Sequence, residues 1–222
     1  MRTLFKAVPA LRSTAALLSL VAATLLATAL PGIARAADLT IQVTTPSGQP
    51  VENAVVTVRP KAGGWAAQAR TRFAWNYQVV QHNIQFDPFV LVVPRGAEVT
   101  FPNRDKVRHH VYSFSPAKKF EIKLYGREED RRVVFDKAGV VSLGCNIHDG
   151  MIAHIYVTDT IHAAKTGADG LAVIKGVPAG SATLTVWQPY LRAARNEVVE
   201  TIEVSGQGTM RRTVRADVRA PR

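Results

Sequence analysis

The chain has 222 residues, a single cysteine and a formal net charge of +11 at pH 7. One cysteine excludes an internal disulfide, so the fold must be stabilised without a covalent staple. The basic charge, concentrated toward the C-terminus, favours an acidic partner or a membrane surface, or else marks a solvated edge strand with a tail. It does not favour nucleic acid, because no aromatic residues are interleaved in that tail.

The first 36 residues have the organisation of a secretory signal peptide. Basic residues precede an apolar stretch at 15–30, and residues 34–36 (Ala-Arg-Ala) form a cleavage site of the small-x-small type. An uncleaved anchor is the alternative, but the apolar stretch is shorter than the roughly 20 residues that a spanning helix needs. We expect export to the periplasm, cleavage after Ala36 and no transmembrane segment in the mature chain. Cleavage lowers the formal charge to +7, because it removes four basic residues and no acidic ones.

Short alternating or β-branched segments recur along the mature chain and predict strands. They are residues 39–43, 54–58, 90–93, 98–101, 111–114, 132–135, 140–143, 152–157, 171–174, 183–187 and 197–204. Turns containing Gly and Pro separate them. Short strands at close spacing are typical of all-β sandwiches, and eleven strands suffice for two small ones.

The outer segments of the mature chain look like two halves of one small sandwich. Residues 39–59 have the form strand, turn, small-residue strand, and residues 165–187 continue it after a turn at Asp169-Gly170. Together they resemble the carboxypeptidase regulatory-like, or transthyretin-like, family. The resemblance implies a split second sandwich with another domain inserted in it or packed on it. The expected parts are the split sandwich at 37–60 and 161–206, a connector at 61–72, the inserted domain at 73–160, and a basic C-terminal strand or tail at 207–222.

Residues 145–151 read Cys-Asn-Ile-His-Asp-Gly-Met and combine three kinds of metal ligand. A thiolate, an imidazole and a thioether suit copper, and two histidines with a cysteine and a weak axial methionine describe an electron-transfer copper centre. In an oxidising compartment a lone thiol is buried, paired with another chain or held by a metal. The spacing of Cys145, His148 and Met151 favours the metal. A second histidine must come from elsewhere in the chain.

A second pattern lies upstream and reads F-x-P, then V-x-x-G-x-x-V-x-F-x-N, then a histidine. Its positions are Phe86, Pro88, Val93, Gly96, Val99, Phe101 and Asn103. With the C-x-x-H-x-x-M spacing, this segment resembles the cupredoxin family, the plastocyanin and amicyanin group of small blue copper proteins. The resemblance implies a Greek-key β-sandwich for residues 73–160, one type 1 copper per chain, and His109 as the fourth ligand.

Three further residues are expected around the site. The resemblance implies that Asn103 ties the strand of His109 to the cysteine loop. His110 points away from His109 by strand alternation, so we expect it beside the ligands or at the surface. Asp149 puts an anion near the metal, which lowers the reduction potential if solvent does not screen it. The other histidines, His82, His154 and His162, are expected to be structural or exposed.

We expect a periplasmic carrier of single electrons and not an enzyme, because the four ligands leave no open position for a substrate. The upstream pattern and the cysteine loop are similar to those of proteins labelled methylamine utilisation proteins. That similarity implies an amine dehydrogenase as a possible donor, and a c-type cytochrome is a reasonable acceptor. Two alternatives remain open: a copper chaperone or store, and a partner-binding β-sandwich with structural copper.

Overall fold

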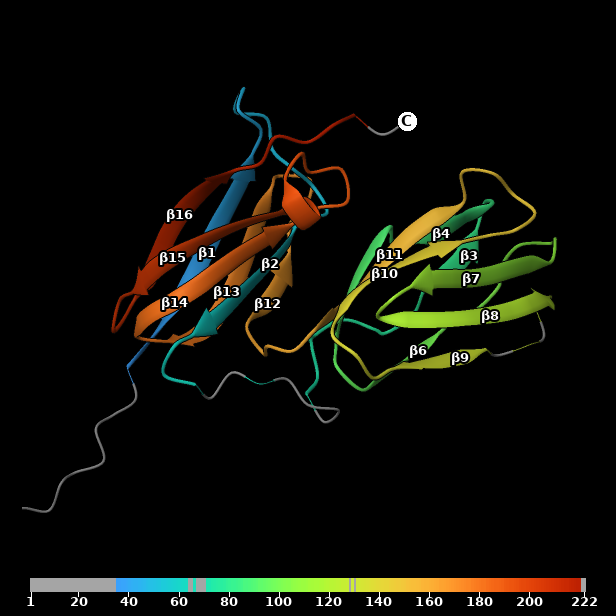
Figure 1. The fold of residues 1–222 in the computed structure, drawn as a ribbon, viewed down its shortest axis with the longest axis horizontal. Coiled ribbons are helices and arrows are strands. Elements are labelled where there is room, and N and C mark those ends of the chain that lie inside the picture. Colours follow the sequence, from blue (N-terminus) through green and yellow to red (C-terminus); the bar gives the residue numbers. More distant parts are fainter. Residues whose placement is uncertain (1–34, 64–65, 67–70, 128, 130, 221–222) are drawn as a thin grey trace, which may run out of the picture. The chain divides into compact units, whose positions relative to one another are not determined.

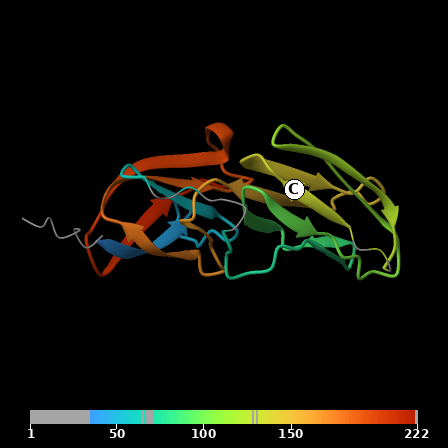
Figure 2. The same ribbon diagram turned by 90° about the horizontal axis from the view of Figure 1, so that it is seen from below.

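The fold is described from a computed structural model. It describes residues 35–63, 66, 71–127, 129 and 131–220, so the predicted signal peptide lies outside the described residues except for Arg35 and Ala36. Strands and loops make up this part of the chain, with one 3-10 turn at Ala194–Asn196 and no α-helix among the described residues (Figures 1 and 2). None of its helical segments meets the length and apolarity needed to cross a membrane.

Strands from the two ends of the described chain build two sheets (Figure 1). One has the order β13-β1-β16 and the other β12-β2-β14-β15. Their bounds are β1 (Ala36–Thr44), β2 (Val55–Pro60), β12 (Ala163–Lys165), β13 (Leu171–Pro178), β14 (Gly180–Trp187), β15 (Glu197–Val204) and β16 (Thr209–Arg215). In β1, Leu39, Ile41 and Val43 are fully buried while their neighbours are not, as expected for a strand with one face on a core. These side chains share one apolar cluster with Leu184 and Ile202.

Strands between residues 80 and 158 build the remaining sheets. A five-stranded sheet has the order β5-β11-β10-β7-β8, and two pairs, β3-β4 and β6-β9, accompany it. Their bounds are β3 (Val80–His82), β4 (Gln85–Asp87), β5 (Val90–Pro94), β6 (Ala97–Thr100), β7 (His109–Ser115), β8 (Lys118–Tyr125), β9 (Arg132–Phe135), β10 (Gly139–Gly144) and β11 (Ile152–Thr158). Their core contains the fully buried side chains of Phe101, Val111, Phe135, Val141 and Ile155.

The predicted all-β class is confirmed, and the second group of sheets forms a cupredoxin-like sandwich. Each of the eleven predicted segments overlaps an observed strand. The sequence pattern does not predict β3, β4, β8 or β12. For residues 207–222 it predicts a strand or a tail, and the structure has β16 there. Three of these strands have only three residues, too few to show a period, and β8 is rich in charged residues because it is an edge strand. The domain boundaries stay a prediction.

Candidate metal centre

Two segments far apart in sequence meet at one end of the five-stranded sheet. β10 ends at Gly144 and β11 begins at Ile152, so residues 145–151 form the loop that joins them. β7 begins at His109 and pairs with β10 through Tyr112 and Gly144. The Tyr112 ring lies so close to Gly144 that an added Cβ would meet it at 2.7 Å. The absence of a side chain at Gly144 thus leaves room for the Tyr112 ring next to Cys145.

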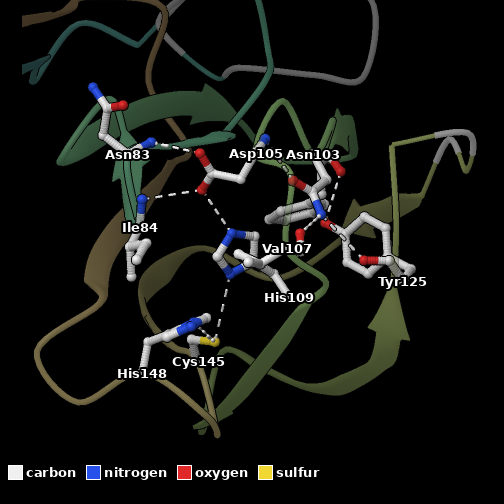
Figure 3. A network of polar contacts seen from close by, with 10 residues as sticks. Asn83, Ile84, Asn103, Asp105, Val107, His109, Tyr125, Cys145 and His148 are labelled. Atoms are coloured by element: carbon white, nitrogen blue, oxygen red, sulfur yellow. Dashed lines mark hydrogen bonds and ion pairs between the residues drawn. The ribbon is translucent and has the colours of Figure 1, made fainter.

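His109, Cys145 and His148 converge at this end of the sheet (Figure 3). The Cys145 Sγ lies 3.6 Å from Nδ1 of His148 and 4.0 Å from Nδ1 of His109, and the three ligand atoms lie within 4.8 Å of one another. The His109 side chain is fully buried, Cys145 is 7% exposed, and His148 is partly exposed. The cluster therefore reaches the surface through His148.

These distances fit a metal ion bound between the three side chains. Metal–sulfur and metal–nitrogen bonds of about 2.3 and 2.0–2.1 Å, at angles between tetrahedral and trigonal, place sulfur and nitrogen roughly 3.5–3.8 Å apart. The observed separations of 3.6 and 4.0 Å lie near that range. Among the described residues, this is the group of His, Cys, Asp and Glu side chains that could hold a metal ion.

The loop that carries Cys145 and His148 is closed by its own backbone. The amide of Cys145 donates to the carbonyl of Met151, and the amide of Met151 donates to the carbonyl of His148, both at 3.2 Å. Met151 is 2% exposed and belongs to the same apolar cluster as Cys145. The structure thus buries the predicted thioether ligand in the core that also contains Cys145.

Asn103 organises the segment that leads into His109 (Figure 3). Its side-chain amide donates to the carbonyls of Val107 at 2.9 Å and Tyr125 at 3.1 Å, and its Oδ1 accepts from the amide of Asp105 at 2.9 Å. The expected tie to the cysteine loop is therefore wrong, because both amide hydrogens serve the turn before β7 and the end of β8. Tyr125 reinforces this turn: its buried hydroxyl donates to the carbonyl of Phe101 at 2.7 Å, and burial holds its pKa well above the usual range.

Asp105 is a site residue that sequence reasoning missed. Its Oδ2 lies 2.7 Å from Nε2 of His109, on the side of the ring opposite Cys145 (Figure 3). Partial burial raises the pKa of Asp105, but hydrogen bonds from the Ile84 amide, His109 and the Asn83 amide outweigh it and hold the pKa below its usual value. The spacing of four residues between Asp105 and His109 was the signal available in the sequence.

The other predicted neighbours lie outside the cluster. His110 is 7% exposed, and its Nε2 lies 2.8 Å from Oε1 of Glu121, so it is a buried residue paired with β8. Asp149 is exposed, so solvent screens its charge. Its predicted effect on the potential depended on the absence of such screening.

The remaining described histidines do not join the cluster. His82 is exposed, and His162 is buried. His154 is half-buried, with its Nδ1 3.1 Å from the Ser142 hydroxyl, and burial lowers its pKa to about 4.

No family model and no curated protein matches the chain by sequence. Among solved structures, a purple cupredoxin from Nitrosopumilus maritimus is 23% identical over 37% of this chain and 100% of its own, with a TM-score of 0.34. A mutant of amicyanin in its reduced Cu(I) form at pH 4 is 21% identical over 46% of this chain and 98% of its own, with a TM-score of 0.35. A copper-containing nitrite reductase from Thermus scotoductus SA-01 is 25% identical over 45% of this chain and 26% of its own, with a TM-score of 0.36.

Proposed function

We propose that the protein is an exported carrier of single electrons that holds one type 1 copper ion between His109, Cys145, His148 and Met151. The observation that carries the proposal is the convergence of two imidazole nitrogens on the sulfur of Cys145 at 3.6 and 4.0 Å. Two histidines and a cysteine with a weak axial thioether suit copper in both oxidation states. A structural zinc site is instead closed by four cysteine, histidine or carboxylate ligands.

The burial of the ligands favours a carrier over a chaperone or store. Transfer of copper to another protein needs exposed, exchangeable ligands, whereas His109 is fully buried and Cys145 is 7% exposed. His148 alone among these three is partly exposed, and its neighbour Ile147 is 49% exposed. This edge offers a redox partner a short path to the ligands and an apolar contact.

His109, Cys145 and His148 have distinct tasks in this proposal. Bound copper supplies a one-electron couple. His109 anchors the ion to the core from β7, because its ring is fixed on both sides. Cys145 supplies the anionic thiolate, and the closed loop holds His148 beside it. Since the ligands are held by strands and backbone hydrogen bonds, little rearrangement should accompany gain or loss of an electron.

The partners we propose are exported redox proteins, with an amine dehydrogenase as donor and a c-type cytochrome as acceptor. The periplasmic location rests on the N-terminal sequence pattern. A small substrate would need an open coordination position on the metal, and the proposed site has none. A partner protein can instead dock at the partly exposed edge beside His148.

Addition of Cu(II) to the purified mature protein tests the copper site. We expect one equivalent to produce an intense visible band from thiolate-to-copper charge transfer. Cys145→Ser should abolish the band, because the sulfur donor is lost. Binding of Cu(II) without such a band would overturn the type 1 assignment.

The matched control is His82→Gln, which changes an exposed histidine outside the cluster. It should keep the band and the stoichiometry, whereas His148→Gln should lose the wild-type spectrum. Stopped-flow oxidation of the Cu(I) protein by a c-type cytochrome then separates a carrier from a store. A carrier exchanges the electron and retains copper, but a store would release the metal.

A further inference from the structure

A carboxylate lies behind the ring of the buried ligand His109. Oδ2 of Asp105 is 2.7 Å from Nε2, while Nδ1 on the other side of the ring faces Cys145 Sγ at 4.0 Å (Figure 3). An imidazole that donates Nε2–H to a carboxylate has an unprotonated Nδ1, which is the form that can bind a metal. The two contacts therefore specify which nitrogen faces the metal position.

The Asp105 carboxylate is itself held in place by the turn between β3 and β4. The amide of Asn83 donates to Oδ1 at 2.7 Å, and the amide of Ile84 donates to Oδ2 at 3.0 Å. The amide of Asp105 donates to Oδ1 of Asn103 at 2.9 Å. The Asp105 side chain is only 11% exposed. A carboxylate with these fixed donors has one orientation, and it transmits that orientation to the ring of His109.

The turn that supplies these donors has an unfavourable backbone conformation. Asn83 and Ile84 have φ values of 54° and 57°. Asparagine tolerates this left-handed region, but a β-branched residue is an outlier there, and such a conformation costs on the order of 1–3 kcal/mol. The conformation nevertheless aims both amides at Asp105. Strain of this kind concentrates where the surrounding structure serves a function.

We propose that Asp105 is a positioning residue that selects the Nδ1-binding form of His109 and lowers the reduction potential of the bound copper. The inference rests on the proposed function. The Asp105 carboxylate, which accepts a hydrogen bond from His109, increases the electron density that Nδ1 donates to the metal. Its negative charge is also poorly screened by solvent. Both effects stabilise Cu(II) more than Cu(I). Asp105 thus takes the role that the sequence had suggested for Asp149, which is exposed.

The test compares Asp105→Asn with two other removals of one negative charge. Asp149→Asn changes the exposed carboxylate in the ligand loop, and Asp136→Asn changes an exposed residue paired with Lys118. We expect Asp105→Asn to lower the Cu(II) affinity about 10–100-fold and to raise the reduction potential. Asp149→Asn should raise the potential less, and Asp136→Asn should leave both quantities unchanged. Equal potentials and affinities for Asp105→Asn and Asp136→Asn would overturn the proposal.

A second measurement needs neither a variant nor copper. Long-range nitrogen–proton NMR of the metal-free wild-type protein at pH 8 reports which ring nitrogen of His109 carries the proton. We expect protonated Nε2 and unprotonated Nδ1. The opposite form would refute the role of Asp105 even if the copper band is present. Absence of the band with the expected tautomer would instead refute the copper function and leave the positioning of His109 intact.

Discussion

The two groups of sheets differ in the side chains that they bury. In the sheets that contain β1 and β14, the described core is a cluster of aliphatic side chains such as Leu39, Ile41 and Leu184. The cupredoxin-like sandwich also buries aromatic side chains such as Phe101 and Phe135, and beside its core lie buried Asn103 and His109 and a turn with Ile84 at positive φ. Buried polar groups and backbone strain do not improve packing. The other sheets also have buried polar residues, such as Thr166 and His162, but beside His109 these features are joined to the ligand cluster, because Asp105 accepts from the Ile84 amide and pairs with His109.

This difference predicts that stability and metal binding can be changed separately. The largest effect on stability is expected for Ile41→Ala, which empties part of the aliphatic core far in sequence from the ligands. We expect the free energy of unfolding to fall by about 2–5 kcal/mol, measured by urea denaturation. The Cu(II) spectrum of the folded variant should match that of the wild type, and a changed spectrum would contradict the separation.

A pH effect is expected from His154 on β11. Its pKa of about 4 lies below the ordinary value of 6.5, because burial disfavours the imidazolium. The unfolded chain therefore binds more protons than the folded protein between these two pH values. The contribution of neutral His154 to the free energy of unfolding is thus complete above about pH 6.5 and is lost as the pH falls toward 4. The loss should be on the order of 2–3 kcal/mol. Urea denaturation at several pH values should show a shallower dependence for His154→Asn than for the wild type.

A smaller effect is expected from two buried hydroxyls, one at the end of β8 and one directly after β12. Tyr125→Phe leaves the Phe101 carbonyl without its donor, and Thr166→Val leaves the Val51 carbonyl and the Ala54 amide without partners. Each should cost about 1–3 kcal/mol of unfolding free energy. Tyr125→Phe should also shift the Cu(II) spectrum, because Tyr125 supports the turn before His109. An unshifted spectrum would show that this turn is not coupled to the site.

The smallest effect, and the one of opposite sign, is expected for Ile84→Gly. Glycine adopts positive φ without strain, and Asn-Gly is favoured in two-residue hairpin turns. The variant should be more stable by about 1 kcal/mol. It keeps the amide that donates to Asp105, so the reduction potential should not move. A loss of stability would show that the Ile84 side chain contributes more than its backbone costs.

The ligand loop was predictable because its chemistry is local. Cys145, His148 and Met151 lie within seven residues, and no tertiary information is needed to see that they can share a metal. The prediction of His109 as a ligand depended on the sequence pattern of the preceding strands. The structure places His109 at the start of β7, beside Cys145. The eleven predicted segments likewise overlap observed strands, and in β1 the period of the sequence reflects one buried face.

Asp105 was not predictable in the same way. Its role depends on a hairpin whose donor amides lie 21 and 22 residues earlier in the chain, at Ile84 and Asn83. β3 and β4 have three residues each, so they leave no periodic signal. Asp149 was the more visible carboxylate because it lies within the ligand motif, yet exposure and screening depend on the fold. Hydrogen-bond partners of polar residues in turns are set by tertiary structure.

X-ray absorption at the copper edge, in the oxidised and reduced protein, tests the central claim most directly. We predict one short copper–sulfur bond and two copper–nitrogen bonds, with small changes between Cu(II) and Cu(I), because His109, Cys145 and His148 are held by the fold. A first shell of nitrogen and oxygen without sulfur would contradict the account, as would loss of a histidine ligand on reduction.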